Sequence, residues 1–95
     1  MTARIAVRVV ISGRVQGVWY RGWTVDRARA AGLCGWVRNR NDGTVEAVFA
    51  GSPDGVEAMI AECRNGPPAA RVDAISRVDA IDEGWTGFSQ LPTTA

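Results

Sequence analysis

The order of the hydrophobic patterns along the 95 residues is the feature that most restricts the fold. Over residues 5–12 apolar side chains alternate with polar or small ones, which predicts a strand with one buried face, ending at Gly13. Between residues 21 and 31 the spacing becomes helical, and Gly32 is placed to end the helix. The stripe of this helix that would face the core consists of Tyr20, Thr24, Ala28 and Ala31.

The middle of the chain adds a hairpin and a second helix. Residues 33–39 and 44–50 have the composition of strands, and the turn at residues 40–43 is short enough to require antiparallel pairing. Ser52 is suited to cap the helix that follows, with Pro53 at its first position. The core-facing stripe of this helix consists of Val56, Met59, Ile60 and Cys63, which gives Cys63 a packing role.

A short repeat marks the last long segment, because residues 71–75 recur as residues 77–81. The offset of six is even and preserves the two faces of a strand, so residues 70–81 are predicted to form one long strand. Its inner face would carry Val72, Ala74, Val78 and Ala80. Residues 88–91 predict a short fifth strand, and residues 92–95 a frayed tail.

The longer elements follow the order strand, helix, strand, strand, helix, strand. This order is typical of ferredoxin-like folds and predicts an α+β sandwich, βαββαβ, in which two helices cover one face of an antiparallel sheet. We expect residues 1–95 to form a single domain. In this arrangement the first and second strands run parallel on either side of the third. The loop at residues 13–17 and Asn39 are therefore expected at one edge of the sheet.

All 11 basic residues are arginines, because the chain contains neither lysine nor histidine. Histidine is thus excluded as a general base or metal ligand, and lysine chemistry of the Walker or Schiff-base type is excluded too. With 10 acidic residues the formal net charge is +1, unlike a general nucleic-acid binder. A sheet that binds single-stranded RNA is the main alternative class, but the chain lacks the aromatic strand motif of such sheets.

The two cysteines, Cys34 and Cys63, do not form a disulfide framework. Free thiols in a reducing compartment are the simpler interpretation, and a single bridge between the two stays open. The sequence has no apolar run of membrane-spanning length, and no stretch with the basic start and apolar core of a signal peptide. These features predict a cytoplasmic protein that does not enter a membrane.

A loop bounded by glycines joins the first strand to the first helix. Gly13 and Gly17 let the backbone turn sharply and approach a ligand closely. A tight loop running into a helix directs successive N–H groups into one concavity, where the helix dipole adds partial positive charge. Arg21, near the start of that helix, can bind a phosphate through two hydrogen bonds from its planar guanidinium.

Two other segments resemble known phosphate-binding motifs in spacing but lack a feature that those motifs require. Residues 17–24 have the spacing of a P-loop, but Trp23 stands where its lysine should be. Residues 34–40 have the cysteine-to-arginine spacing of cysteine phosphatases, but an extended strand does not curl its N–H groups around a phosphate. The spacing of the carboxylates favours no metal site. Those expected on the solvated surface instead are Asp26, Asp42 and Glu46.

Two longer motifs resemble those of a known family. Residues 13–21, Gly-Arg-Val-Gln-Gly-Val-Trp-Tyr-Arg, look like the first acylphosphatase motif, with Tyr20 in place of a commoner phenylalanine. Residues 35–46, Gly-Trp-Val-Arg-Asn-Arg-Asn-Asp-Gly-Thr-Val-Glu, with Gly51 beyond them, look like the second. The resemblance extends over residues 5–91 and is specific, because two long motifs occur at the expected separation.

The resemblance implies that Arg21 and Asn39 form a catalytic pair. It also implies that a stretch of backbone holds the phosphate, namely Val15, Gln16, Gly17, Val18, Trp19, Tyr20 and Arg21. We expect Asn39 to place the attacking water. The alternatives are that Arg21 is only a surface residue of its helix and that Asn39 only terminates its strand. Thr24 is expected to bond within its helix or to brace the catalytic pair. The side chain of Gln16 is expected to bond its own loop, and Tyr20 and Trp36 to be core or wall residues.

The activity implied by the resemblance is hydrolysis of acyl phosphates to a carboxylate and inorganic phosphate, by direct attack of water without a covalent intermediate. A carboxylate leaving group needs no general acid, which explains how a site without histidine can work. We expect no cofactor, no metal and no nucleic acid, a small-molecule substrate, inorganic phosphate as product and inhibitor, and a monomer. Similar domains begin hydrogenase-maturation carbamoyltransferases, but the chain ends soon after its last strand, which favours a free-standing enzyme.

Overall fold

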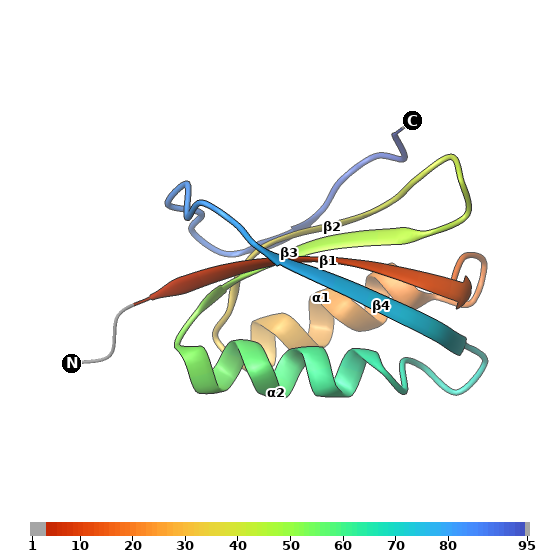
Figure 1. The fold of residues 1–95 in the computed structure, drawn as a ribbon, viewed down its shortest axis with the longest axis horizontal. Coiled ribbons are helices and arrows are strands. Elements are labelled where there is room, and N and C mark those ends of the chain that lie inside the picture. The colour runs from red at the N-terminus through yellow and green to blue at the C-terminus, as the bar shows by residue number, and fades with distance from the viewer. Residues whose placement is uncertain (1–3, 95) are drawn as a thin grey trace.

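The structure, a computed structural model, describes residues 4–94. The elements are β1 (Ile5–Arg14), α1 (Tyr20–Ala30), β2 (Cys34–Asn39), β3 (Val45–Gly51), α2 (Pro53–Cys63), β4 (Arg71–Asp79) and β5 (Phe88–Gln90). Figure 1 shows two layers, with both helices on one side of the sheet. The prediction of an α+β ferredoxin-like fold is confirmed. No helix among the described residues is long and apolar enough to cross a membrane.

The strands lie in the order β4-β1-β3-β2-β5. Both β1 and β2 pair antiparallel with β3, which lies between them, so they run parallel to each other as predicted. β4 pairs antiparallel with β1, but β5 pairs parallel with β2. The sheet is therefore mixed, and the prediction of a purely antiparallel sheet is wrong for this last strand. The reason is that residues 80–87 cross to the opposite edge at the end of the sheet where β2 begins, so β5 runs alongside β2.

The main core lies between the sheet and the helices. Val7, Val9 and Ile11 of β1 are buried toward the helices, as the alternating pattern predicts. Other large members of this core include Tyr20, Trp23, Leu33, Val37, Val45, Phe49, Val56, Met59, Ile60 and Phe88. Burying each large apolar side chain contributes roughly 1.5–3 kcal/mol, so this cluster supplies most of the stabilisation of the fold.

Gly32 ends α1 as predicted. It has a φ of +70°, and its N–H donates to the carbonyl of Arg29 at 3.1 Å, while the Leu33 N–H donates to that of Ala28 at 2.9 Å. These are the two hydrogen bonds of a Schellman motif. Ala31 lies beyond the last helical residue and is exposed, so its predicted place in the buried stripe is wrong.

α2 begins where the sequence predicts. The Ser52 hydroxyl accepts a hydrogen bond from the Gly55 N–H at 3.1 Å, and Pro53 occupies the first helical position. The predicted stripe of this helix is buried, including Cys63, which is fully inaccessible. Cys34 and Cys63 are both free thiols, so the alternative of a bridge between them does not hold in this structure.

A bulge in β4 breaks the simple alternation that its sequence repeat predicts. Ser12 pairs with Ala74, but the next residue, Gly13, pairs with Val72, so Asp73 is an extra residue in the ladder. Gly13 has a φ of +125°, and a Cβ there would overlap the backbone of β4. The close approach of the two strands at the bulge therefore requires glycine.

The bulge changes which residues of β4 face the core. Val72 and Ile75, three positions apart, both pack against the main core. Val78 instead pairs with Arg8 on the face away from the helices and is 55% exposed, and Ala80 packs on that same open face. The predicted inner face of this strand holds for Val72 but is wrong for Val78 and Ala80, because one inserted residue reverses the alternation.

The segment after β5 continues along β2. The Thr94 N–H donates to the Asn39 carbonyl at 3.1 Å, and the Thr94 carbonyl accepts from the Asn41 N–H at 2.8 Å. The prediction of a frayed tail is wrong for residues 92–94, because the free end of β2 offers hydrogen-bonding partners to this segment. The rest of the predicted tail, Ala95, lies outside the described residues.

A thiol titration should distinguish the two cysteines. Burial raises the pKa of the Cys63 thiol to about 12, whereas Cys34 is only half-buried. Because the thiolate is the reactive form, we expect Ellman's reagent to modify one thiol per chain in the folded protein and two after unfolding. Fast modification of both thiols in the folded state, or of neither after unfolding without reductant, would contradict this assignment.

Candidate active site

The loop between β1 and α1 leads into an uncapped helix N-terminus. Gly17 has a φ of +72° and Trp19 a φ of +66°, so the backbone turns sharply before the helix begins. Trp19 occupies the N-cap position, yet no side chain caps the first turn and that turn contains no acidic residue. Within the described chain, the N–H groups of residues 15–22 donate to no protein acceptor. Unpaired donors and the positive end of the helix dipole favour an anion here.

A cavity of about 120 Å³ opens at this helix end. Its walls are formed by Val15, Gly17, Trp19, Tyr20, Arg21, Gly22, Asn39 and Gln90. A molecule of liquid water occupies about 30 Å³, so the cavity accommodates a group of a few heavy atoms. A phosphate group is of this size.

Arg21 and Asn39 both line this cavity, although they come from different elements. Arg21 lies in the first turn of α1, and Asn39 is the last residue of β2. The shared neighbour β3 holds β1 and β2 parallel, so the loop after β1 and the end of β2 lie at one end of the sheet. Between residues 4 and 94, Arg21 takes part in no ion pair and the Asn39 carboxamide in no hydrogen bond. Both side chains are therefore available to a ligand.

Two residues of the cavity wall were not anticipated from the sequence. Gly22 follows the first motif directly, and a Cβ at this position would overlap the indole of Trp19. Gln90 belongs to β5 and lies opposite Val37 of β2. No local pattern identifies Gln90, because its place in the wall depends on β5 pairing with β2.

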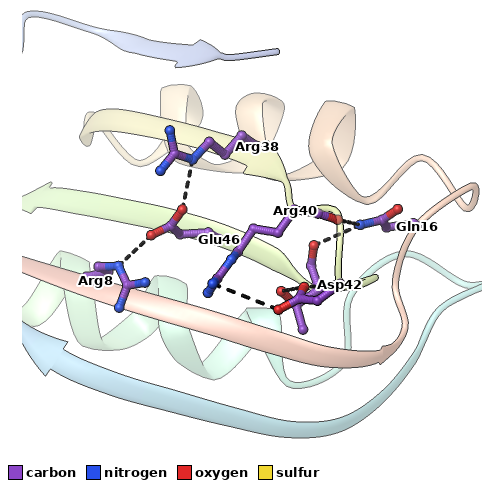
Figure 2. Close-up of polar contacts among 7 residues, drawn as sticks. Arg8, Gln16, Arg38, Arg40, Asp42 and Glu46 are labelled. Carbon is purple, nitrogen blue, oxygen red and sulfur yellow. Dashed lines mark hydrogen bonds and ion pairs between the residues drawn. The ribbon is translucent and has the colours of Figure 1, made fainter. Parts of the chain in front are cut away.

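The side chain of Gln16 reaches across to the turn between β2 and β3. Its Nε2 donates to the carbonyl of Arg40 at 2.8 Å and to that of Thr44 at 2.9 Å (Figure 2). The turn is closed by the Gly43 N–H, which donates to the Arg40 carbonyl at 3.2 Å, and Gly43 has a positive φ of +90°. The expectation that Gln16 bonds its own loop is therefore wrong, because the sheet brings the turn within its reach.

The other residues predicted for the loop divide between core and cavity. Val15 and Tyr20 are buried and contribute to the cavity wall, while Val18 packs against the core without lining the cavity. The Tyr20 hydroxyl donates to the Cys63 carbonyl, and burial raises the pKa of that hydroxyl, so it stays protonated. The Thr24 hydroxyl donates to the Tyr20 carbonyl at 2.8 Å, which favours the expectation of a bond within its helix.

Comparisons with known proteins point to one family. The family model described as Acylphosphatase matches residues 7–89. An acylphosphatase of Rhodospirillum rubrum is 59% identical over 85 residues, covering 90% of this chain and 93% of the relative. One of Rhizorhabdus wittichii is 58% identical over 90 residues, covering 95% and 91%. The crystal structure of acylphosphatase from Bacillus subtilis matches with a TM-score of 0.89 at 34% identity, covering 92% of this chain and 98% of that one. The chain belongs to the acylphosphatase family.

In this member of the acylphosphatase family the two motifs form facing parts of one region. The first, residues 13–21, makes the end of β1, the loop and the start of α1. The second, residues 35–46, makes most of β2, its turn and the start of β3. The family resemblance inferred from these motifs is confirmed.

A buried carboxylate at the end of the second motif connects three strands on the open face of the sheet. Glu46 of β3 is 4% exposed and accepts hydrogen bonds from the Nε atoms of Arg8 on β1 and Arg38 on β2 (Figure 2). The guanidinium of Arg38 also lies 4.6 Å from the ring centroid of Trp36. The prediction that Glu46 is a solvated surface carboxylate is wrong. Its side chain is buried, and arginines of the two neighbouring strands neutralise its charge.

The remaining carboxylates and arginines of this region are solvent-exposed or paired. Asp26 and Asp42 are exposed, as predicted. Asp42 accepts hydrogen bonds from the N–H and hydroxyl of Thr44, and these bonds with the Arg40 charge hold the pKa of this carboxyl below its ordinary value. Arg14 is exposed at the end of β1.

Glu46 makes stability dependent on pH. Burial raises the pKa of its carboxyl, but hydrogen bonds and charge from Arg38 and Arg8 outweigh burial and hold the pKa below its ordinary 4.5. The group therefore stabilises the fold above that value, and the stabilisation is lost as pH falls through the lower pKa of the folded state. We expect Glu46→Gln to lower the free energy of unfolding by about 2 kcal/mol at neutral pH.

Urea unfolding of both proteins across the acid range measures this effect. The difference between parent and Glu46→Gln should shrink as the pH falls from neutrality through the lowered pKa of the Glu46 carboxyl in the folded state, where that carboxyl gains its proton. A difference that stays constant over this range would contradict an ion-paired carboxylate at position 46.

Proposed function

We propose that this chain hydrolyses the carboxyl–phosphate anhydride bond of acyl phosphates, releasing a carboxylate and inorganic phosphate. The observation that best supports this function is the cavity whose wall contains Arg21, Asn39 and a series of unpaired N–H groups. These groups suit phosphoryl transfer, in which positioning and charge stabilisation account for most of the catalysis. Family membership supports the same activity.

In the proposed complex the phosphate occupies the cavity at the start of α1. The N–H groups from Val15 to Tyr20 would bind its oxygens, where the helix dipole also favours negative charge. The guanidinium of Arg21 would give two parallel hydrogen bonds to the same group and fix its orientation. This role fits the absence of any ion pair for Arg21 within residues 4–94.

Asn39 would hold the attacking water on the opposite wall. Its carboxamide can accept one hydrogen bond from the water and donate another to the phosphate, which orients the water oxygen toward phosphorus. The hydrogen bond from the Thr94 N–H to the Asn39 carbonyl fixes the backbone from which that side chain projects.

The reaction would proceed in one displacement without a covalent intermediate. The water oxygen bonds to phosphorus while the bond from phosphorus to the acyl oxygen breaks, and its electron pair leaves with the carboxylate. The proton of the water passes to a phosphate oxygen. A carboxylate is a stable leaving group, so no general acid is required, in agreement with a chain that contains no histidine.

Several further properties follow from this proposal. The substrate is a small molecule recognised chiefly by its phosphate, and inorganic phosphate, the product, would compete for the same cavity. The enzyme would need no metal or cofactor, and would act as a cytoplasmic monomer in which residues 1–95 form one domain. Arg21 and Asn39 come from the same chain, so a single copy can assemble the site.

Kinetics of benzoyl phosphate hydrolysis with EDTA present tests these roles. Arg21→Ala should abolish activity. Arg21→Lys should also lose most of it, because the ammonium group of lysine cannot make the two parallel hydrogen bonds of a planar guanidinium. Asn39→Ala should lower kcat by about 10²–10³, the effect of removing one preorganised hydrogen-bonding group. Phosphate should inhibit the parent competitively. Full activity of Asn39→Ala, or loss of parental activity in EDTA, would overturn the proposed mechanism.

A further inference from the structure

Trp19 combines an exposed aromatic ring with an unfavourable backbone conformation. Its side chain is 63% exposed, whereas Tyr20, Phe49 and Phe88 are buried. Within residues 4–94 it is the one non-glycine residue with a positive φ, +66°. A β-carbon disfavours this left-handed conformation, which glycine adopts freely. Such strain persists where the surrounding structure enforces it and is concentrated at functional sites.

The indole of Trp19 has a defined place at the cavity. A Cβ at Gly22 would overlap Nε1 of the ring, so the missing side chain of Gly22 leaves room for the indole against the first turn of α1. Trp19 and Gly22 both line the cavity that contains Arg21. The ring is therefore a preorganised apolar surface beside the phosphate site.

The size of the cavity decides which part of the substrate meets this ring. At about 120 Å³ it has room for the phosphate and the attacking water, but not for a bulky acyl group as well. The acyl group must therefore extend out of the cavity, where the exposed indole lies. Aromatic rings bind a flat apolar group through stacking and edge contacts, beyond the effect of buried area.

Resting on the proposed function, we propose that Trp19 is an acyl-group subsite that makes this enzyme prefer acyl phosphates with an aromatic acyl group. The indole contacts the acyl group while Arg21 and the loop hold the phosphate. The ratio of kcat/KM for benzoyl phosphate to kcat/KM for acetyl phosphate measures this preference, because both substrates share the phosphate and the bond that breaks.

The test compares this ratio in the parent, Trp19→Phe and Trp19→Gly. Trp19→Phe keeps an aromatic ring and should retain most of the preference. Trp19→Gly removes the ring but suits the left-handed backbone, and should lower the ratio about tenfold. Trp85→Ala is a matched control, because Trp85 packs on the open face away from the cavity, and its ratio should equal the parent's.

The outcomes separate this proposal from the enzymatic function itself. If the parent hydrolyses both substrates and Trp19→Gly keeps its ratio within twofold, the subsite is refuted and the function stands. If the parent hydrolyses neither substrate, the proposed function fails first. An equal loss of ratio in Trp85→Ala would show a global effect and would also refute the subsite.

A separate observation concerns the side chain of Gln16. Both hydrogen bonds from its Nε2, at 2.8 and 2.9 Å, end on the turn directly after Asn39 (Figure 2). The paired part of β1 and β3 ends at Ile11 and Val45, so the loop beyond β1 has left the ladder. Gln16 therefore connects the loop that carries the phosphate donors to the strand end that carries Asn39.

We infer that Gln16 is a positioning residue that sets the place of Asn39 relative to the phosphate. Without this connection the loop would still bind phosphate through its own N–H groups and Arg21, but Asn39 would hold the water less well. Loss of the Gln16 side chain should therefore lower turnover more than it weakens phosphate binding. A purely structural role would affect turnover and phosphate binding together.

Gln16→Met keeps the length of the side chain and removes both donors, and Gln16→Ala removes the side chain. We expect each to lower kcat for benzoyl phosphate about tenfold, while the inhibition constant of inorganic phosphate changes less than threefold. Ser52→Ala is the stability control, because it removes a helix cap at the far end of α2 and should leave kcat unchanged. A parental kcat in Gln16→Met, or loss of phosphate inhibition parallel to kcat, would overturn this role.

Discussion

The backbone hydrogen bonds that hold β1 and β2 on the two sides of β3 are the constraint on which the rest of the structure depends. They make β1 and β2 parallel, so the loop after one strand and the last residue of the other meet at the same end of the sheet. The wall that contains Arg21 and Asn39 exists because of this pairing. The main core holds the helices over the same sheet, so the start of α1 cannot move away from the end of β2.

The candidate site consists of groups that folding itself leaves unsatisfied. N–H groups at residues 15–22 have no protein acceptor within the described chain, and Trp19 is both exposed and left-handed. Such features cost stability of the order of 1–3 kcal/mol for a strained residue alone, and burial of the core must offset them. A phosphate in the cavity would supply the missing acceptors. The same features that weaken the apo protein locally therefore preorganise it for a tetrahedral anion.

Local signals in the sequence predicted the end of α1 and the start of α2 well. Gly32 and Ser52 act through bonds to their immediate neighbours, so their roles follow from residue type and position alone. The bulge at Asp73 and the burial of Glu46 were missed, because both depend on the strands that lie alongside. An even sequence repeat cannot reveal an inserted residue, and a lone glutamate gives no sign that two arginines on other strands will neutralise it.

By itself the sequence determined where the chain is extended or helical, which faces are apolar, and that two long motifs belong to one family. These properties are local, because backbone preference and the burial of one face depend on residues a few positions apart. Only the tertiary structure decided that Gln16 bonds the turn after Asn39, that Gln90 completes the cavity wall, and that Thr94 extends the pairing of β2. Those contacts join residues that are distant in the chain, and they require the register and strand order of the folded sheet.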